Sequence, residues 1–400
     1  MHTNMHTNIS SDEALALVRG IEALRDLPAP PRVYVAATGA GAGIQNTLWR
    51  VPGCSSFLVG TAFPYAKADT DEFLGYELES YCSAEAAVAF ATEAYRRAVV
   101  GGEGPAIGLG VVAAVGTIRK LKGGSRFHIA VMTDEGCSVL THNIVTAHES
   151  YGTLPEAGYW RRIHGDKCDR KALRVLLETA GVLEEREALN DAQALATDLL
   201  FAHPYFRADR VRTQEPQPCD LTVFPGAFNP PHAGHFGMVD EVERGNHSNR
   251  NNSVAFHITA DPPHKAALTV QELLRRLPAL RGRNVLFSRG DALYIDKARR
   301  RPSCCIIIGA DALDRTMDPS WGPAIEPMIQ EFRSLFVRFL VFGRNGERAS
   351  VLIKSVTSKY DAENIGWSDR GFNVFQPFEG EWDASSTAIR NGQDVKAAVG

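Results

Sequence analysis

The second half of the chain alternates short apolar runs with amphipathic segments. The apolar runs have the length and the β-branched content of buried strands, and they occupy residues 221–226, 254–260, 304–311 and 339–346. The segments between and after them repeat apolar residues at helical spacing, which predicts helices at 232–245, 270–282, 325–336 and 385–395. Apolar strands that alternate with helices predict a parallel sheet covered on both faces.

The first half shows a related alternation of glycine-rich loops and β-branched runs. The runs occupy 32–43, 55–63, 106–118 and 127–134, and helical periodicity occupies 11–27 and 83–99. This pattern indicates an α/β layer of its own. We therefore expect an α/β protein with two domains, an amino-terminal domain at 1–165 and a carboxy-terminal domain at 220–400. A helical bridge and a charged, proline-containing linker are expected between them at 166–219.

Composition narrows the class of protein. The chain has 400 residues, of which 44% are hydrophobic and 22% are charged, as in ordinary globular proteins. The net charge of −4 argues against general binding to nucleic acid or to an anionic membrane. No apolar run approaches the roughly 20 residues of a membrane helix, and the first residues lack a signal-peptide pattern. Seven cysteines without a C-x-x-C pair fit a reducing compartment, so we expect a cytoplasmic protein.

The turn after the first strand of the second half carries candidate chemistry. It reads GAFNPPHAGH over residues 226–235 and places His232 and His235 three residues apart at a helix start. In a parallel sheet, ligands bind where such a strand turns into its helix. The free N–H groups there favour an anion, and Gly234 leaves room for close approach. Two imidazoles at this place indicate a phosphate site.

Two simpler interpretations of the histidines compete with this one. A histidine near a helix start is usually a surface or capping residue. A metal site would need a further ligand, and no nearby glutamate or third ligand fits the usual zinc patterns. The position directly after a strand favours the phosphate site.

A second candidate for phosphate binding lies near the end of the chain. Residues 385–390 read SSTAIR, which predicts a hydroxyl-capped helix start with an arginine one turn later. Its free N–H groups could hold further phosphates. A simple capped helix is the alternative.

Together these motifs resemble the nucleotidylyltransferase superfamily. More narrowly, they are similar to nicotinate/nicotinamide mononucleotide adenylyltransferases. Further matches follow in order: PPHK at 262–265, IGAD at 308–311, and Trp321 at the place of the tryptophan that stacks on the pyridine ring in that family. The resemblance covers about residues 221–391.

The resemblance implies a Rossmann-like domain that performs ATP-dependent adenylyl transfer in NAD biosynthesis. A phosphate oxygen of nicotinate or nicotinamide mononucleotide attacks the α-phosphorus of ATP, and pyrophosphate leaves. Mg²⁺ would accompany ATP without a dedicated protein site. The resemblance assigns His232 and His235 to catalysis on the reacting phosphates, Gly226, Phe228, Ser386, Thr387 and Arg390 to ATP, and Lys265, Asp311 and Trp321 to the acceptor. Lys265 is equally consistent with a solvated loop lysine.

Two segments depart from that family. Residues 293–297 read LYIDK where the family often has an S-Y-T-x-D-T-like segment, and residues 312–320 before Trp321 also differ. Both lie near the expected position of the pyridine base. A different phosphorylated acceptor is therefore an open alternative.

The glycines of the first half do not form a standard phosphate-binding loop, because neither G-K-[S/T] nor G-x-G-x-x-G is present. The stretch instead resembles the carboxy-terminal domain of the CinA family, the nicotinamide mononucleotide deamidases. The frame of that family is kept at Thr38-Gly39, 52–56, Tyr65 and Leu74-Gly75. The family's serine falls at Ala36, its lysine at about Thr70 and its threonine near Leu109, so we expect a domain without catalysis. A shift of a few residues would bring in a hydroxyl such as Thr38.

One further hypothesis assigns the protein to a class other than enzymes. Two eroded enzyme domains could form a nucleotide sensor or a scaffold, although intact H-x-G-H and S-S-T-x-I-R motifs argue against erosion. The expected partners are ATP and a phosphorylated small molecule, with no nucleic acid and no membrane. The amino-terminal domain is the candidate surface for homo-oligomer formation.

Overall fold

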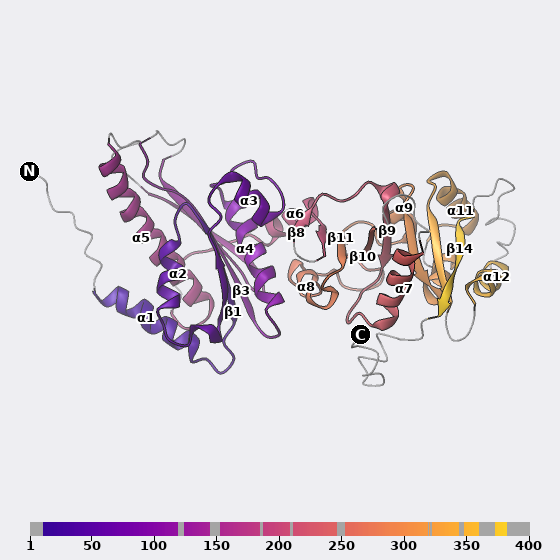
Figure 1. Ribbon diagram of the computed structural model, residues 1–400, viewed down its shortest axis with the longest axis horizontal. Coiled ribbons are helices and arrows are strands. Elements are labelled where there is room, and N and C mark those ends of the chain that lie inside the picture. The colour runs from indigo at the N-terminus through magenta and orange to yellow at the C-terminus, as the bar shows by residue number, and fades with distance from the viewer. Residues whose placement is uncertain are drawn as a thin grey trace, which may run out of the picture. The chain divides into compact units, whose positions relative to one another are not determined.

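The computed structural model describes the chain in segments. They are 11–118, 124–144, 153–184, 187–208, 211–245, 253–318, 320, 322–343, 348–359 and 373–381. Contacts divide the chain into unit 1, Met1–Leu199, and unit 2, Leu200–Gly400. Each unit has its own sheet with helices packed on it (Figure 1). The predicted α/β class with two domains is confirmed.

Unit 1 contains a six-stranded mixed sheet. Its helices are α1 (Ser11–Arg25), α2 (Ala42–Trp49), η1 (Cys54–Ser56), α3 (Lys67–Leu74), α4 (Ala84–Val100) and α5 (Leu154–Thr179), and α6 (Gln193–Ala202) crosses into unit 2. Its strands are β1 (Arg32–Thr38), β2 (Leu58–Ala62), β3 (Ala106–Ala114), β4 (Arg126–Met132), β5 (Cys137–Asn143) and β6 (Asn190–Asp191). The strand order is β2-β1-β3-β4-β5-β6. β1 runs parallel to β2 and β3, and the remaining pairs are antiparallel.

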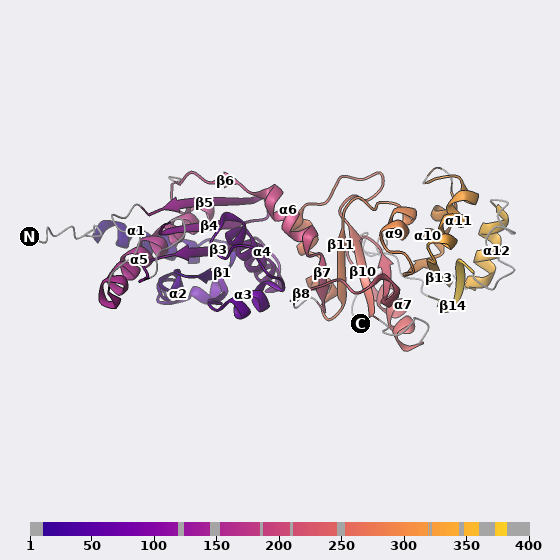
Figure 2. The same ribbon diagram turned by 90° about the horizontal axis from the view of Figure 1, so that it is seen from above.

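The sheet of unit 1 lies between two helical layers. Alternate residues of β1, β3 and β4 form one apolar core with α1, α2 and α5. The opposite face packs against α4, and Figure 2 shows β3, β4 and β5 side by side in this layer. A strand period of two explains how one strand supplies side chains to both cores.

Two glycines allow α4 to approach β3 closely. A Cβ on Gly108 would lie 2.2 Å from the backbone nitrogen of Tyr95, and a Cβ on Gly110 would lie 2.3 Å from the carbonyl oxygen of Ala87. The contacting atoms are backbone, so they cannot move aside as a side-chain end could. The glycine-rich part of β3 is therefore a packing feature.

Unit 2 contains an eight-stranded sheet. Its strands are β7 (Tyr205–Arg207), β8 (Val211–Thr213), β9 (Leu221–Pro225), β10 (Ser253–Thr259), β11 (Asn284–Ser288), β12 (Cys305–Gly309), β13 (Arg338–Gly343) and β14 (Phe375–Glu381). Its helices are η2 (Pro218–Asp220), α7 (Ala233–Arg244), α8 (Val270–Leu274), η3 (Pro278–Leu280), α9 (Tyr294–Arg300), α10 (Ala310–Met317), α11 (Ile325–Ser334) and α12 (Ala349–Lys359).

The strand order of unit 2 is β14-β13-β12-β9-β10-β11-β7-β8. The first six of these strands are parallel, and β7 and β8 are added antiparallel at one edge. Numbered along the chain, the parallel strands have the order 3-2-1-4-5-6 of doubly wound nucleotide-binding sheets, with the reversal between β9 and β12. This confirms the expected Rossmann-like arrangement.

The predicted bridge and linker at 166–219 are not a separate segment. Six residues of α5, from Cys168 to Leu177, belong to the core of unit 1, because its apolar stripe packs against α1 and α2. β7 and β8 extend the sheet of unit 2, so charged residues around them flank edge strands. The domains therefore do not end at 165 and begin at 220.

Other boundaries also differ from the expectation. The helix predicted at 270–282 ends at Leu274, because Pro278 lacks the N–H that would continue it, and a short η3 turn follows. The strand pattern of β11 was not recognised. The helix predicted at 385–395 lies outside the described residues.

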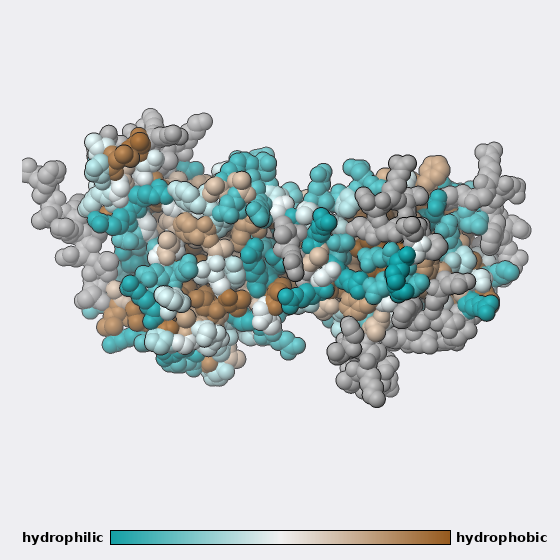
Figure 3. All heavy atoms as spheres, viewed as in Figure 1, coloured by the Kyte–Doolittle hydropathy of each residue, from teal (hydrophilic) through white to brown (hydrophobic). Residues whose placement is uncertain are grey.

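The visible face of each unit carries both polar and apolar residues (Figure 3). Figure 3 shows hydrophilic residues spread over the visible face of each unit. Among the described residues, no helix is both long and apolar enough to cross a membrane.

The close approach of α4 and β3 gives a stability prediction. Gly108→Ala should lower the free energy of unfolding by about 1–3 kcal/mol, because the added methyl group overlaps the backbone of α4. Gly165→Ala is the matched control, because nothing lies within 4 Å of its Cβ and alanine favours the helix α5. Chemical denaturation followed by circular dichroism measures both. Equal stability of the two variants would contradict the close packing.

Candidate nucleotide-binding site

The site begins where β9 ends. β9 is central in the sheet, with β10 on one side and β12 on the other. The chain then forms a loop at 226–232, and α7 begins at Ala233 with His232 as its N-cap residue. Because the strand order reverses between β9 and β12, this loop faces the crevice where ligands of such sheets bind.

The two histidines stack at this helix start. Their ring centroids are 3.6 Å apart and the ring planes differ by 24°. The backbone N–H of His232 donates to Nδ1 of His235 at 3.2 Å. Because Nδ1 accepts, the proton of a neutral His235 is on Nε2. This ring therefore offers an Nε2–H donor at the amino end of α7.

Burial keeps His235 uncharged. It lowers the pKa of His235 to about 3, and the neighbouring His232 contributes to the same shift. At neutral pH the ring is therefore a neutral hydrogen-bond donor. A bound anion beside it would favour the protonated form.

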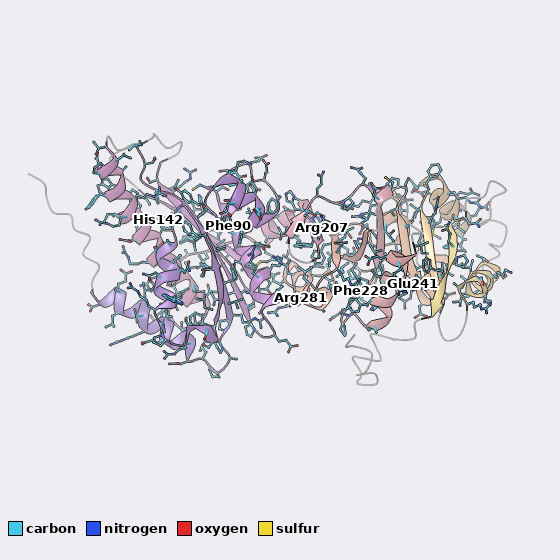
Figure 4. All side chains as sticks on the ribbon, in the orientation of Figure 1. Phe90, His142, Arg207, Phe228, Glu241 and Arg281 are labelled. Carbon is cyan, nitrogen blue, oxygen red and sulfur yellow. The ribbon has the colours of Figure 1, made fainter. Side chains whose placement is uncertain are left out.

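The ring of Phe228 packs against the ring of His235. Its ring is buried and lies 4.9 Å from the ring of His235 in an edge arrangement. It also contacts Phe256 of β10 at 4.8 Å. Gly226 is required beneath it, because a Cβ there would lie 2.6 Å from the Phe228 ring. Figure 4 labels Phe228 beside α7.

The same loop lines a cavity of about 580 Å³. Gly226, Ala227 and Asn229 line it, whereas Phe228 packs toward His235. Neither histidine of the pair is among the described residues that line the cavity. Further lining residues come from the carboxyl end of β10, the segment after it, Arg276 beyond the end of α8, α9, α10 and the start of α11.

The charged side chains that line the cavity are all basic. They are Lys265, Arg276, Lys297 and Arg315, and no aspartate or glutamate of the described residues lines it. Nη1 of Arg276 is buried without a hydrogen-bond partner. Burial lowers the pKa of Arg276, against the raising effect of Glu272. Because four basic side chains line the cavity without a carboxylate among the described lining residues, this arrangement favours an anionic ligand.

Two lining residues of the cavity, His257 and Lys297, belong to a buried polar network. Nε2 of His257 lies 2.6 Å from Oγ of Ser288, which donates to Asp291 at 2.5 Å. Asp291 also pairs with Arg301 at 3.1 Å and with Lys297 at 3.7 Å. Arg301 also forms a salt bridge with Glu215 at 2.5 Å. All members except Glu215 are buried, so the network is held by charges as well as by packing.

The structure brings together some of the residues expected from the sequence. Phe228, His232 and His235 form one cluster, and Gly226 and Lys265 line the adjacent cavity. Asp311 lies in the first turn of α10 and is exposed, and it is not among the described residues that line the cavity. Trp321, Ser386, Thr387 and Arg390 lie outside the described residues.

Sequence reasoning missed His257, Arg276, Lys297 and Arg315. Arg276 follows an amphipathic helix, where a basic residue indicates a solvated surface. Lys297 occupies a segment that differs from the family pattern. That difference was the one feature of the sequence that could have marked Lys297 as a candidate site residue.

The glycine-rich turn of unit 1 binds a carboxylate from another helix of the same unit. Oδ2 of Asp169, from α5, accepts the N–H of Gly43 at 2.9 Å at the start of α2. A Cβ on Gly43 would lie 2.2 Å from that oxygen. Burial raises the pKa of Asp169 to about 6, although N–H groups of Gly43 and Gly41 lower it.

The positions of unit 1 where the serine, threonine and lysine of the CinA family fall are buried. Ala36 and Leu109 are fully buried in β1 and β3, and Thr70 is buried in α3. Thr38 ends β1 and is also buried. Tyr65 is exposed, and Nη2 of Arg161 donates to its hydroxyl at 2.9 Å.

Across the part of the chain that the structure describes, no group of three or more histidine, cysteine, aspartate or glutamate side chains could hold a metal ion.

Comparisons with known proteins give distant matches. No family model matches the chain, and no curated protein matches it. Among solved structures, a competence-damaged protein (CinA) superfamily protein from Escherichia coli is 13% identical, covers 43% of this chain and 93% of its own, and has a TM-score of 0.33. CihA from Agrobacterium tumefaciens is 20% identical over 42% of this chain and 96% of its own, with a TM-score of 0.31. A CinA superfamily protein from Enterobacter cloacae is 13% identical over 45% and 99%, with a TM-score of 0.32. At these values the likeness assigns no activity to the chain.

Proposed function

We propose that unit 2 transfers the adenylyl group of ATP to a phosphorylated acceptor, with a pyridine mononucleotide as the preferred acceptor class. One arrangement carries the proposal: a stacked histidine pair at a helix start adjoins a cavity whose charged lining, among the described residues, is basic. The amino end of α7 supplies N–H groups and a positive dipole to the phosphates of ATP.

In the proposed reaction, an oxygen of the acceptor phosphate attacks the α-phosphorus of ATP. The bond from that phosphorus to its bridging oxygen breaks, and pyrophosphate leaves with the electron pair. Such a transfer depends on alignment and on stabilising the developing charge. His235 donates from Nε2 to a reacting phosphate, and Phe228 keeps its ring in place. His232 lies against the same phosphates.

The basic cavity side chains bind the acceptor in this proposal. The guanidinium group of Arg276 would donate to a phosphate oxygen, and Lys265 and Arg315 add positive charge at the same cavity. Mg²⁺ enters with ATP and screens its phosphates. Ser386, Thr387 and Arg390 remain proposed ligands of the β and γ phosphates, and Trp321 and Asp311 remain proposed contacts of the acceptor.

We propose no catalysis for unit 1. Asp169 fills the position at the start of α2 where a ligand phosphate would bind, and the family's serine position is a buried alanine. Its proposed role is to support assembly or regulation of unit 2.

Pyrophosphate release tests this function. Purified protein is incubated with ATP, Mg²⁺ and either nicotinate mononucleotide, nicotinamide mononucleotide or other phosphorylated acceptors. Turnover with a pyridine mononucleotide supports the proposal, and turnover only with another acceptor keeps adenylyl transfer but changes the substrate. ATP binding without turnover would favour a nucleotide sensor.

Substitution of the histidine tests its role directly. His235→Gln should reduce kcat about 100- to 1000-fold, because one charge-stabilising donor is misplaced. The circular dichroism spectrum should stay unchanged. His142→Gln, in β5 of unit 1, is the control and should keep full turnover. Unchanged kcat in His235→Gln would remove this residue from the reaction.

Binding of ATP should be coupled to proton uptake. The pKa of His235 is about 3 in the free protein, and the triphosphate should raise it. Affinity for Mg²⁺–ATP should therefore increase as the pH falls from neutral toward about 3, because the bound state takes up the proton at a higher pH than the free protein. Calorimetry in buffers of different ionisation enthalpy measures the uptake. His235→Gln removes the titrating ring and corrects for protonation of ATP, so equal uptake in both proteins would contradict the coupling.

Arg276 should govern affinity for the acceptor. Arg276→Met should raise the KM for the acceptor about tenfold or more, because a charged hydrogen bond contributes about 1.5–3 kcal/mol. The KM for ATP should change little. Arg281→Met is the matched control, since Arg281 is exposed and does not line the cavity (Figure 4). An equal effect of both substitutions would point to general loss of positive charge.

A further inference from the structure

The basic side chains of the cavity come from two sides of β9. Lys265 and Arg276 belong to the connection that follows β10, and Arg315 belongs to α10, which follows β12. The strand order β12-β9-β10 places these two connections on opposite sides of the central strand. Neighbouring strands lie about 4.8 Å apart, so β10 and β12 are separated by about 10 Å across β9. A small molecule that bridges this crevice meets a basic side chain near each of its ends.

Arg315 is accessible to a ligand. It is exposed and lines the cavity. The two carboxylates of α10, Asp311 and Asp314, do not line the cavity, and Asp314 forms a salt bridge with Lys359 at 2.7 Å. On this side the ligand therefore meets a guanidinium group and, among the described lining residues, no carboxylate.

Lys297, the fourth basic residue of the cavity, belongs to a network whose charges cancel. Lys297 and Arg301 share the carboxylate of Asp291, and Arg301 also pairs with Glu215. Two cations and two carboxylates compensate one another within this network. The positive charge that a ligand meets therefore comes mainly from the other three basic residues.

The lining near Arg315 suits an aromatic ring. Ala312 precedes Arg315 by one turn on the same face of α10, and Tyr294 and Met328 add further apolar surface to the cavity. Burial raises the pKa of the Tyr294 hydroxyl to about 12, and the positive charge of Arg315 opposes that shift. The guanidinium group therefore lies near the Tyr294 side chain. Apolar surface beside one cation fits a planar ring that carries an anionic group.

We propose that Arg315 pairs with a carboxylate on the ring of the acceptor, so that the cavity selects nicotinate mononucleotide over nicotinamide mononucleotide. This inference rests on the proposed function and chooses between its two acceptors. The phosphate of the acceptor lies toward Arg276 and Lys265, on the other side of β9. A carboxylate accepts two parallel hydrogen bonds from a guanidinium fork. A neutral carboxamide accepts only through its carbonyl oxygen and adds no charge.

Calorimetric titration of the full chain with each mononucleotide tests the proposal. Nicotinate mononucleotide should bind about fivefold tighter or more, because it adds an ion pair that stays partly exposed to solvent. Arg315→Met should remove most of this ratio. Arg315→Lys should keep part of it, because lysine keeps the charge and loses the fork. Arg281→Met is the matched control and should keep the full ratio, since Arg281 is exposed and does not line the cavity.

The effect of salt on this ratio is a second test, which does not depend on whether a variant folds. Both ligands carry the same phosphate and pyridinium ring, so screening of those charges cancels in the ratio of affinities. The additional ion pair is exposed, and the ratio should fall toward one between about 0.05 M and about 0.5 M sodium chloride.

Several results would overturn the role of Arg315. They are equal affinities at low salt, tighter binding of the amide, a ratio that salt or Arg315→Met leaves unchanged, an equal loss of the ratio in Arg281→Met, and no binding of either mononucleotide.

Turnover separates this inference from the proposed function. Tighter binding of nicotinate mononucleotide without pyrophosphate release would support the role of Arg315 and remove adenylyl transfer. Pyrophosphate release with nicotinamide mononucleotide alone would support adenylyl transfer and overturn the role of Arg315.

Discussion

The reversal of strand order between β9 and β12 is the constraint on which unit 2 depends. Connections leave the two strands toward opposite faces of the sheet, so no helix covers the edge where they end. The loop after β9 fills part of this crevice, packs Phe228 against His235 and lines the cavity. The histidine pair and the cavity both adjoin this loop. Gly226 and Phe228, which fix the conformation of the loop, therefore affect both candidate binding surfaces.

Charge in the interior of unit 2 is organised by one carboxylate. Asp291 pairs with Arg301 and Lys297 and receives the hydroxyl proton of Ser288. It thereby compensates two buried cations and orients His257. Breaking such a network leaves an uncompensated charge, which is why its members act as a unit.

The two units use the same element differently. Both place a helix start after a central strand, where N–H groups attract an anion. In unit 1, Asp169 of α5 supplies that anion from within the protein. In unit 2, the corresponding start of α7 carries His232 and His235 and no carboxylate cap. The contrast explains why the proposed chemistry lies in unit 2.

The sequence by itself determined the α/β class, the central strands and the histidine pair. The apolar runs of β9, β10 and β12 and the helical spacing of apolar residues in the 17-residue helix α4 are clear in the sequence. The two histidines lie close together in one motif. The edge strands β7 and β8 were missed because three residues carry too little periodicity. Only the tertiary structure decided that α5 belongs to unit 1 and that His257, Arg276 and Arg315 share a cavity. These residues are far apart in sequence, and their proximity depends on how helices pack over the carboxyl ends of the strands, which no local pattern encodes.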